Sequence, residues 1–199
     1  MIEKIVKNII PYLEELNFSE VVGGIATTIS QNKPTKDNKI IVKKFPAYYN
    51  ETKTTCNASD YIDLVPNTSK RSIIYFENNG IKISPINGNI FECVANVRLV
   101  CWCNLKKIND TFVNADLIKL AVIQAMPVSL SNVFPYSFIR IELTGEETKS
   151  VALFSKYTYN EEEKQYLIFP FDYFALNYEV SFYVGSNCIE PITISPSIC

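Results

Sequence analysis

Three of the chain's six cysteines lie within eleven residues, in the segment Cys93 to Cys103 (CVANVRLVCWC), which ends in a C-x-C pair. Clustered thiols can bind a metal, form a redox or disulfide pair, or pack in a core as small hydrophobic side chains. A structural zinc site typically needs four ligands, so further thiols would have to come from Cys56, Cys188 and Cys199, because the chain contains no histidine. The common C-x₂-C and C-x₄-C spacings do not occur in this segment.

The apolar residues of this segment favour the third interpretation. Alternate residues of a β-strand share a face, and the cysteines fall on a face that is apolar throughout. That face comprises Phe91, Cys93, Ala95, Val97, Leu99, Cys101, Cys103 and Leu105. The opposite face is mixed and includes Glu92, Arg98 and Trp102. Neighbouring cysteines on one face lie about 7 Å apart, too far for easy bridging. We predict a central strand with buried thiols, and neither metal nor cofactor.

The sequence gives little indication of any other catalytic or phosphate-binding site. The absence of histidine removes the commonest general base and the commonest metal ligand. The best acidic cluster, Glu161, Glu162 and Glu163, falls in an expected turn, where a solvated charge run is more typical than a catalytic pair. Gly23-Gly24 lacks the context of a phosphate-binding loop, and we expect it to end the first helical region or to separate it from the next segment. We therefore predict no catalytic residue and no enzyme.

The net charge and the distribution of apolar residues argue against DNA-binding, secreted and membrane-spanning proteins. The formal net charge of -2 and the pI near 5.3 give no overall basic field, so DNA readout is not expected. The first twenty residues carry acids and lysines between apolar positions, unlike a signal peptide. A run of about 18 apolar residues, as a membrane span requires, is absent from the sequence. We expect no membrane association, and a chain that is intracellular or delivered without secretion.

The apolar periodicity predicts one α+β domain over residues 1–199, with a mostly antiparallel sheet, an N-terminal amphipathic helix and one helix between strands. The expected parts are a helix at 1–16, an extended arm or loop at about 30–72, a core at about 73–185 and a tail at 186–199. Pro11 predicts a kink in the first helix, or a restart there. No second core is expected.

Turn residues divide the core into elements. Residues 71–86 predict two strands joined at Asn78-Asn79-Gly80, and a second turn at 87–89 precedes the cysteine strand. Residues 113–127 predict a helix capped by Asn114 and stopped by Pro127. Four further strands are expected, at 137–143, 148–159, 164–171 and 172–184. In the last of these, Phe174, Leu176, Tyr178, Val180, Phe182 and Val184 share an apolar face.

The segment 30–72 contains only two brief strand candidates, at 39–45 and 61–65, so we interpret it as a long surface loop or as an arm that packs on a neighbouring subunit. Residues 31–56 contain six lysines and two acids, a net charge of +4, whereas residues 141–180 contain eight acids and three lysines, a net charge of -5. An arm could therefore meet an acidic edge of a neighbour. The candidate subunit interface comprises Lys33, Lys36, Lys39, Lys43, Lys44, Trp102, Glu161, Glu162, Glu163 and Tyr183. The two aromatic residues are included because they lie opposite the apolar faces of their strands, where they would cover the sheet or contact another protein.

The order of elements over residues 1–16 and 80–185 resembles the tail terminator and tail-completion proteins of tailed bacteriophages, and the ring proteins of phage necks. The closing strand FALNYEVSFYV is similar to the last strand of that family. The resemblance implies a non-enzymatic virion protein, made in the host cytoplasm, that forms a homomeric ring at the head-tail connector or the tail end. Its partners would be other neck or tail proteins, and DNA would pass through its channel without sequence-specific binding. The segment 30–72 and the tail after Gly185 depart from the family pattern.

Two other classes stay open from the residues alone. One is a bacterial ligand-binding or protein-binding module whose aromatic residues form a recognition surface. The other is an enzyme that works without histidine. A ring predicts discrete oligomers, whereas a binding module predicts a monomer with a saturable ligand.

Overall fold

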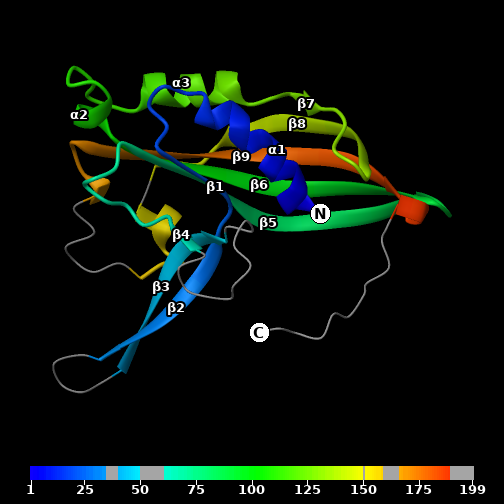
Figure 1. Cartoon of the computed structure of the whole chain (residues 1–199), viewed down its shortest axis with the longest axis horizontal. Helices are drawn as coiled ribbons and strands as arrows, with labels where there is room; N and C mark the ends of the chain where they lie inside the picture. Colours follow the sequence, from blue (N-terminus) through cyan, green and yellow to red (C-terminus); the bar gives the residue numbers. More distant parts are fainter. Residues whose placement is uncertain (35–39, 50–60, 150, 159–165, 189–199) are drawn as a thin grey trace.

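The computed structural model describes residues 1–34, 40–49, 61–149, 151–158 and 166–188 (Figure 1). The main sheet has six strands in the order β1-β5-β6-β9-β8-β7, and a second sheet has the order β2-β3-β4. The strands are β1 (Val21–Ile25), β2 (Thr27–Pro34), β3 (Ile40–Tyr49), β4 (Tyr61–Asp63), β5 (Ser72–Asn87), β6 (Ile90–Asn104), β7 (Ser129–Leu130), β8 (Tyr136–Glu146) and β9 (Phe171–Gly185). All strand pairs are antiparallel except β1 with β5.

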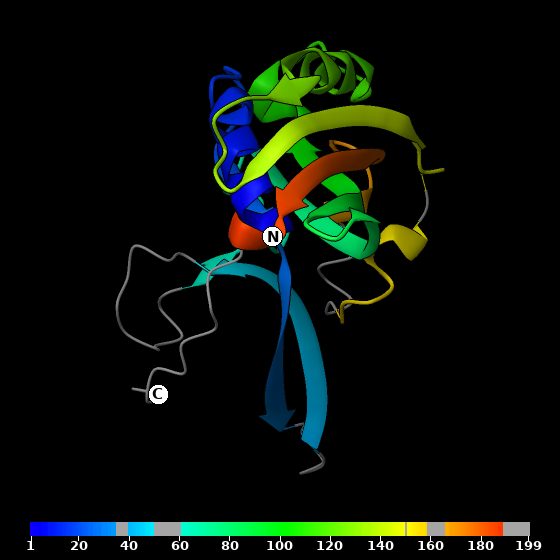
Figure 2. The same ribbon diagram turned by 90° about the vertical axis from the view of Figure 1, so that its right-hand side faces the viewer.

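The helices are α1 (Ile2–Glu14), α2 (Leu105–Ile108) and α3 (Asp116–Ala125), with short 3-10 turns η2 (Val151–Phe154) and η4 (Ser186–Cys188). Helices α1 and α3 lie on one face of the main sheet, and the β2–β3 hairpin extends away from the other face (Figures 1 and 2). The predicted fold class is confirmed: α+β, a mostly antiparallel sheet, an N-terminal helix and a helix between strands. Helix α1 includes Pro11 within one continuous span, so it does not restart there.

The cysteine segment forms β6, which lies between β5 and β9 in the middle of the sheet. Cys93, Cys101 and Cys103 are buried and unbridged in the core beneath α1 and α3. The same core contains the predicted apolar face of β9, so both alternating patterns are confirmed. A second buried cluster lies on the opposite face of the sheet, around Val100 and Trp102. The mixed residue pattern on that face did not predict it.

The turn prediction at Asn78-Asn79-Gly80 was wrong, because β5 continues through these residues as one strand. Its register against β6 shifts between Asn78 and Ile81, and Gly80 has a φ of +124°. The positive φ of Gly80 therefore belongs to a β-bulge, and glycine adopts this backbone conformation without steric cost because it has no Cβ atom. The chain reverses at the second predicted turn, where Asn87 pairs with Ile90 across two residues.

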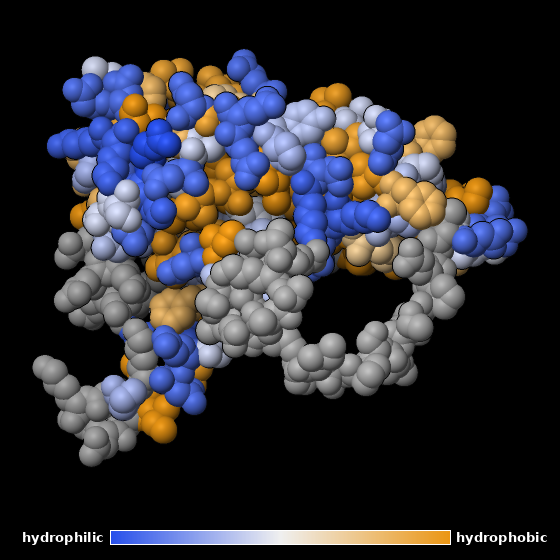
Figure 3. Space-filling model, in the orientation of Figure 1, coloured by the Kyte–Doolittle hydropathy of each residue, from blue (hydrophilic) through white to orange (hydrophobic). Residues whose placement is uncertain are grey.

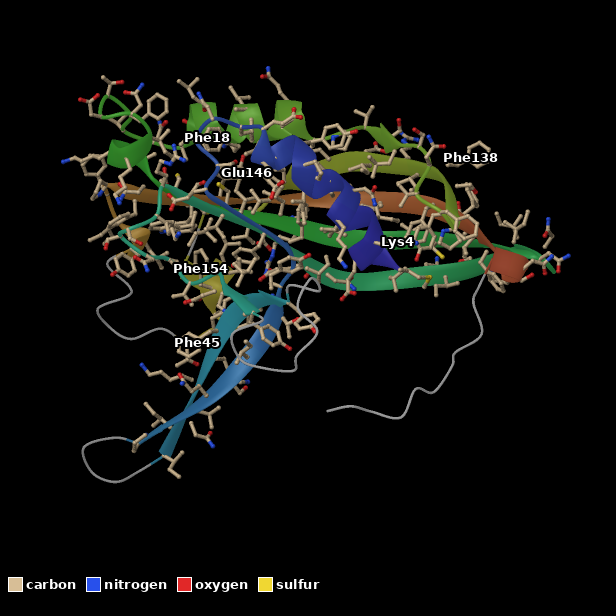
Figure 4. All side chains as sticks on the ribbon, in the orientation of Figure 1. Lys4, Phe18, Phe45, Phe138, Glu146 and Phe154 are labelled. Carbon is tan, nitrogen blue, oxygen red and sulfur yellow. The ribbon has the colours of Figure 1, made fainter. Side chains whose placement is uncertain are left out.

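Two other predicted strands, at 148–159 and 164–171, do not form in the described residues. Residues 151–154 are a 3-10 turn, and β9 begins only at Phe171. The described residues of these segments instead contribute to the cover of the second face of the sheet, where Phe154 and Tyr157 join the second buried cluster. Figure 4 shows Phe154 on the side of the sheet from which the hairpin extends. Apolar side chains are removed from water when they cover an apolar face, just as they are on the buried face of a strand.

Gly23-Gly24 lies inside β1, so its prediction as a helix end or a spacer was wrong. A Cβ atom on Gly24 would stand 2.5 Å from the Tyr48 ring, and one on Gly23 would stand 3.0 Å from Leu64. The two glycines thus let the base of the second sheet approach β1 closely. Because only Ala26 separates β1 from β2, the chain passes directly from the main sheet into the hairpin.

Candidate assembly surface, buried polar network and cavity

The β2–β3 hairpin, which we call the arm, projects away from the body of the protein (Figures 1 and 2). The strand candidates at 39–45 and 61–65 correspond to β3 and β4, but β2 was missed, because Thr27–Pro34 has too few apolar residues to show alternation. Three consecutive branched aliphatic residues near the end of the arm are exposed: Ile40 by 70%, Ile41 by 42% and Val42 by 52%. Figure 3 shows apolar surface gathered there, apart from the body of the protein.

The predicted interface lysines have different environments. Lys44 is exposed on β3, whereas Lys43 is buried to 6% exposure. Lys33 belongs to β2, and Lys36 and Lys39 lie outside the described residues. The backbone oxygen of Lys44 accepts a hydrogen bond of 2.8 Å from the Thr158 amide, which ties the arm to the segment that covers the second face. The base of the arm is therefore anchored, and its far end is exposed.

Trp102 is not a surface residue, so its place in the predicted interface is corrected. Its side chain is 1% exposed, and its indole Nε1 donates a 2.6 Å hydrogen bond to the Tyr166 backbone oxygen. The Phe171 ring stacks on it with centroids 5.4 Å apart. The partner on this face is thus the protein's own chain. Tyr183 does remain partly exposed, where its hydroxyl donates to Glu92 at 3.3 Å.

Three acids of the predicted acidic edge form ion pairs within the described part of the chain. Glu146 accepts a 2.9 Å contact from Lys119, Glu147 pairs with Arg98 at 2.7 Å, and Asp172 pairs with Lys149. Glu161, Glu162 and Glu163 lie outside the described residues. A simple count of charges in the sequence therefore overstated the acidic surface available to a neighbouring arm.

A buried ionic network that the sequence reasoning missed surrounds Glu77, whose side chain is 2% exposed. One carboxylate oxygen accepts from Arg98 Nε at 2.7 Å and Nη2 at 2.5 Å. The other accepts from the Tyr157 hydroxyl at 2.6 Å and from Lys156 Nζ at 2.5 Å. Burial by itself would lower the pKa of Arg98, but Glu77 and Glu147 raise it above its ordinary value. The network joins β5 and β6 to the segment that covers the second face.

The register gave the only local clue to this network, since Glu77 lies directly opposite Arg98 on neighbouring strands. Opposite charges at such positions attract. Tyr157, however, is 80 residues from Glu77 along the chain, and no short-range pattern links them.

The buried thiols of the central strand β6 are expected to be unreactive. Burial raises the pKa of Cys101 well above its ordinary value, and burial also raises the pKa of Cys103 to about 12. Both thiols therefore stay protonated at neutral pH, where only a thiolate would react or bind a metal. No group of three or more metal-ligating side chains is present among the residues that the structure describes.

We expect Cys101→Ala and Cys103→Ala each to lower the free energy of unfolding by about 1 kcal/mol, because each removes a buried sulfur from a filled core. Urea denaturation would measure the loss. Elemental mass spectrometry of the purified protein should find no stoichiometric metal in the parent or in either variant. Bound zinc in the parent that disappears in the variants would contradict the assignment of these thiols to the core.

A cavity of about 310 Å³ lies where the loop after α1 meets α2 and α3. Phe18, Phe112 and Ile118 contribute apolar walls, and Arg71 and Lys107 contribute positive charge. The cavity is separate from the arm, which extends from the other face of the sheet. The sequence reasoning did not predict it, because its lining residues come from four different segments.

Comparison with known proteins adds no relative: no protein-family model, curated protein sequence or solved structure matches the chain. None of the helices in the described part of the chain is long and apolar enough to cross a membrane.

Proposed function

We propose that the chain is a structural virion protein of a tailed bacteriophage that forms a homomeric ring at the head-tail connector or the tail end. The observation that carries this proposal is the arm, a hairpin whose far end exposes Ile40, Ile41 and Val42 to solvent. β3 is the middle strand of its sheet, but β4 pairs with it only at Ala47–Tyr49, so among the described residues the far end of β3 has one open edge. An exposed apolar strand edge invites pairing with another chain, so monomeric proteins avoid it. The resemblance in element order to phage tail and neck proteins supplies the biological setting.

A closed ring needs two different surface patches on each subunit, related by a rotation that closes. The arm is one patch, and it leaves the main sheet beside β1 and β5 (Figure 1). At the opposite side of the sheet, β7 pairs with β8 at only two described residues, Ile139 and Arg140. The Ile141 amide on that edge also donates a 2.9 Å hydrogen bond to the Val128 oxygen. From Glu142 to Glu146 no strand among the described residues pairs with this edge of β8. An arm at one edge and an open strand at the other provide two different patches.

In this proposal the ring joins other neck or tail proteins, and DNA passes through it without sequence-specific binding. The net charge of -2 supports such passage, because an overall basic surface would hold the DNA phosphates. The protein would be made in the host cytoplasm and incorporated into the virion. It would act by positioning its partners, with no catalytic step.

Native mass spectrometry and negative-stain imaging of the purified chain test the proposal. We expect a discrete oligomer with ring-shaped particles, and we expect Val42→Asp to shift it toward monomer by placing a charge at the apolar end of the arm. Val113→Asp is the matched control, because Val113 is 78% exposed but lies far from the arm, before α3. A parent chain that remains monomeric up to about 100 μM, a concentration well above those of ordinary stable assemblies, would refute the ring.

A ligand-binding module is the second candidate, and the cavity near α2 is the observation that favours it. Such a module would stay monomeric and bind its ligand saturably. The same mass measurement therefore distinguishes the two candidates.

A further inference from the structure

The cavity near α2 has an apolar floor. Ile118 on α3 is 2% exposed and Phe18 is 7% exposed, and the side chains of Phe112 and Ile108 add to the wall. Figure 4 shows Phe18 just beyond α1, beneath α3. The volume of about 310 Å³ lies at the lower end of the range for small-molecule sites. The cavity therefore suits a compact apolar group, such as a phenyl ring or a branched aliphatic chain.

The mouth of the cavity is cationic, and backbone carbonyl groups hold the cations. Lys107 Nζ donates a 2.7 Å hydrogen bond to the Ser69 oxygen, and Arg71 Nη1 donates to the Asn17 oxygen at 3.4 Å. A carbonyl partner fixes the position of a cation but leaves its positive charge intact. None of the ion pairs found among the described residues includes Lys107.

Nearby acids do not cancel this charge. Arg71 has one carboxylate close to its guanidinium, that of Glu20, with Nε 3.7 Å from its oxygen. The same carboxylate lies 3.1 Å from Lys70 Nζ, so one negative charge serves two positive ones. Lys107 has no ion-pair partner among the described residues, so the two cations that line the cavity are only partly neutralised. An anionic group on a ligand would therefore complete the charge balance at the mouth and form charge-assisted hydrogen bonds.

We propose that this cavity is a binding site for a small monocarboxylate with a compact apolar body. The apolar part occupies the floor formed by Phe18, Phe112 and Ile118, and the carboxylate faces Lys107 and Arg71. The site lies on the helix-covered face of the sheet, so its occupancy does not depend on the arm or on ring formation. The inference thus goes beyond the proposed assembly function and can fail or hold independently of it.

The test uses 3-phenylpropionate as the probe and 3-phenylpropanol as its neutral counterpart. The full chain is labelled with ¹³C in the isoleucine δ-methyl groups, and Ile108→Val and Ile118→Val assign the two signals from the cavity wall. We expect 3-phenylpropionate to shift both signals saturably and to bind about tenfold more tightly than 3-phenylpropanol, about the contribution of one hydrogen bond to a charged group. Shifts that do not saturate, or equal affinities for both probes, would overturn the proposal.

Two lysines next to each other provide a matched pair of variants. Lys107→Gln removes the charge at the mouth and is expected to weaken 3-phenylpropionate binding about tenfold, with no change for 3-phenylpropanol. Lys106→Gln is the control, because Lys106 lies over the Phe169 ring, 5.7 Å from its centroid, and does not line the cavity. Equal affinities of the two variants for 3-phenylpropionate would contradict the assigned role of Lys107.

Filling the cavity gives an independent check. Ala121 on α3 lines the cavity and is only partly buried, so Ala121→Phe places a ring in the space without replacing a core residue. We expect this variant to lose binding of both probes while its unfolding transition stays close to that of the parent. Retained binding of 3-phenylpropionate by a folded Ala121→Phe protein would show that the probe binds elsewhere and would overturn the proposal.

Discussion

Excision of residues 31–43, with Ser30 joined to Lys44 through an Asn-Gly turn, is expected to abolish self-association and leave the body of the protein folded. Ser30 and Lys44 are directly paired across β2 and β3, so a two-residue turn closes the shortened hairpin. The excision removes the exposed apolar end but keeps the base of the arm, including the hydrogen bond from the Thr158 amide to the Lys44 oxygen.

The expected result is a loss of the oligomer at every concentration, because the proposed contact would then lack one of its two patches. Native mass spectrometry would measure the oligomer, and urea denaturation should show a free energy of unfolding within about 1 kcal/mol of the parent, because only Lys43 is buried among the excised residues whose side chains the structure describes. A full-length variant with Ile40, Ile41 and Val42 replaced by Ser separates the apolar contact from the backbone of the arm. An excised chain that still forms the parent oligomer would contradict the role of the arm in assembly.

Glu77→Gln is expected to lower the free energy of unfolding by about 3 kcal/mol, the lower end for a broken buried ion pair, because Arg98 loses its buried counter-charge and keeps only the partly exposed Glu147. The substitution also weakens the acceptor shared by Tyr157 and Lys156, and so loosens the cover over the second face. Urea denaturation of parent and variant measures the difference. Trp102 fluorescence would report whether the cover opens, since the indole is buried beneath that segment.

Glu142→Gln is the matched control for this prediction. Glu142 pairs with Arg140 at 2.9 Å, but both side chains are more than half exposed, so its loss is expected to cost less than about 1 kcal/mol. The double variant Glu77→Met with Arg98→Met should recover part of the lost stability, because it removes both buried charges together. Equal effects of Glu77→Gln and Glu142→Gln would show that the network contributes no more than a surface pair.

Local periodicity was sufficient for several elements of the fold. Alternation identified β6 and β9 and the buried face of each, and the residues around Asp116 identified α3. The same alternation assigned Cys101 and Cys103 to the core, which the structure confirms. These predictions succeeded because a strand or helix with one apolar face must turn that face inward, whatever else the chain does.

The sequence-based predictions failed where the local structure depends on a contact with a residue distant along the chain, or on the close approach of two backbone segments. Asn-Gly at 79–80 is compatible with either a hairpin turn or a β-bulge. The bulge forms because β5 pairs with β6 on both sides of these residues. Gly23-Gly24 is required by Tyr48 and Leu64, which pack against β1 from the second sheet. Such choices depend on the position of a neighbour, which a local pattern does not contain.

The sequence by itself determined the α+β class, a mostly antiparallel sheet with an N-terminal helix and a helix between strands, and the burial of the thiols of β6. Only the tertiary structure decided what covers the other face, because Trp102 meets a residue 64 positions away and Glu77 meets one 80 positions away. It also placed three exposed aliphatic residues at the end of an arm and gathered the cavity near α2 from four segments. Periodicity specifies which side of a helix or strand is buried. Long-range packing decides which residues cover that side, and the candidate sites of this protein are formed by such long-range packing.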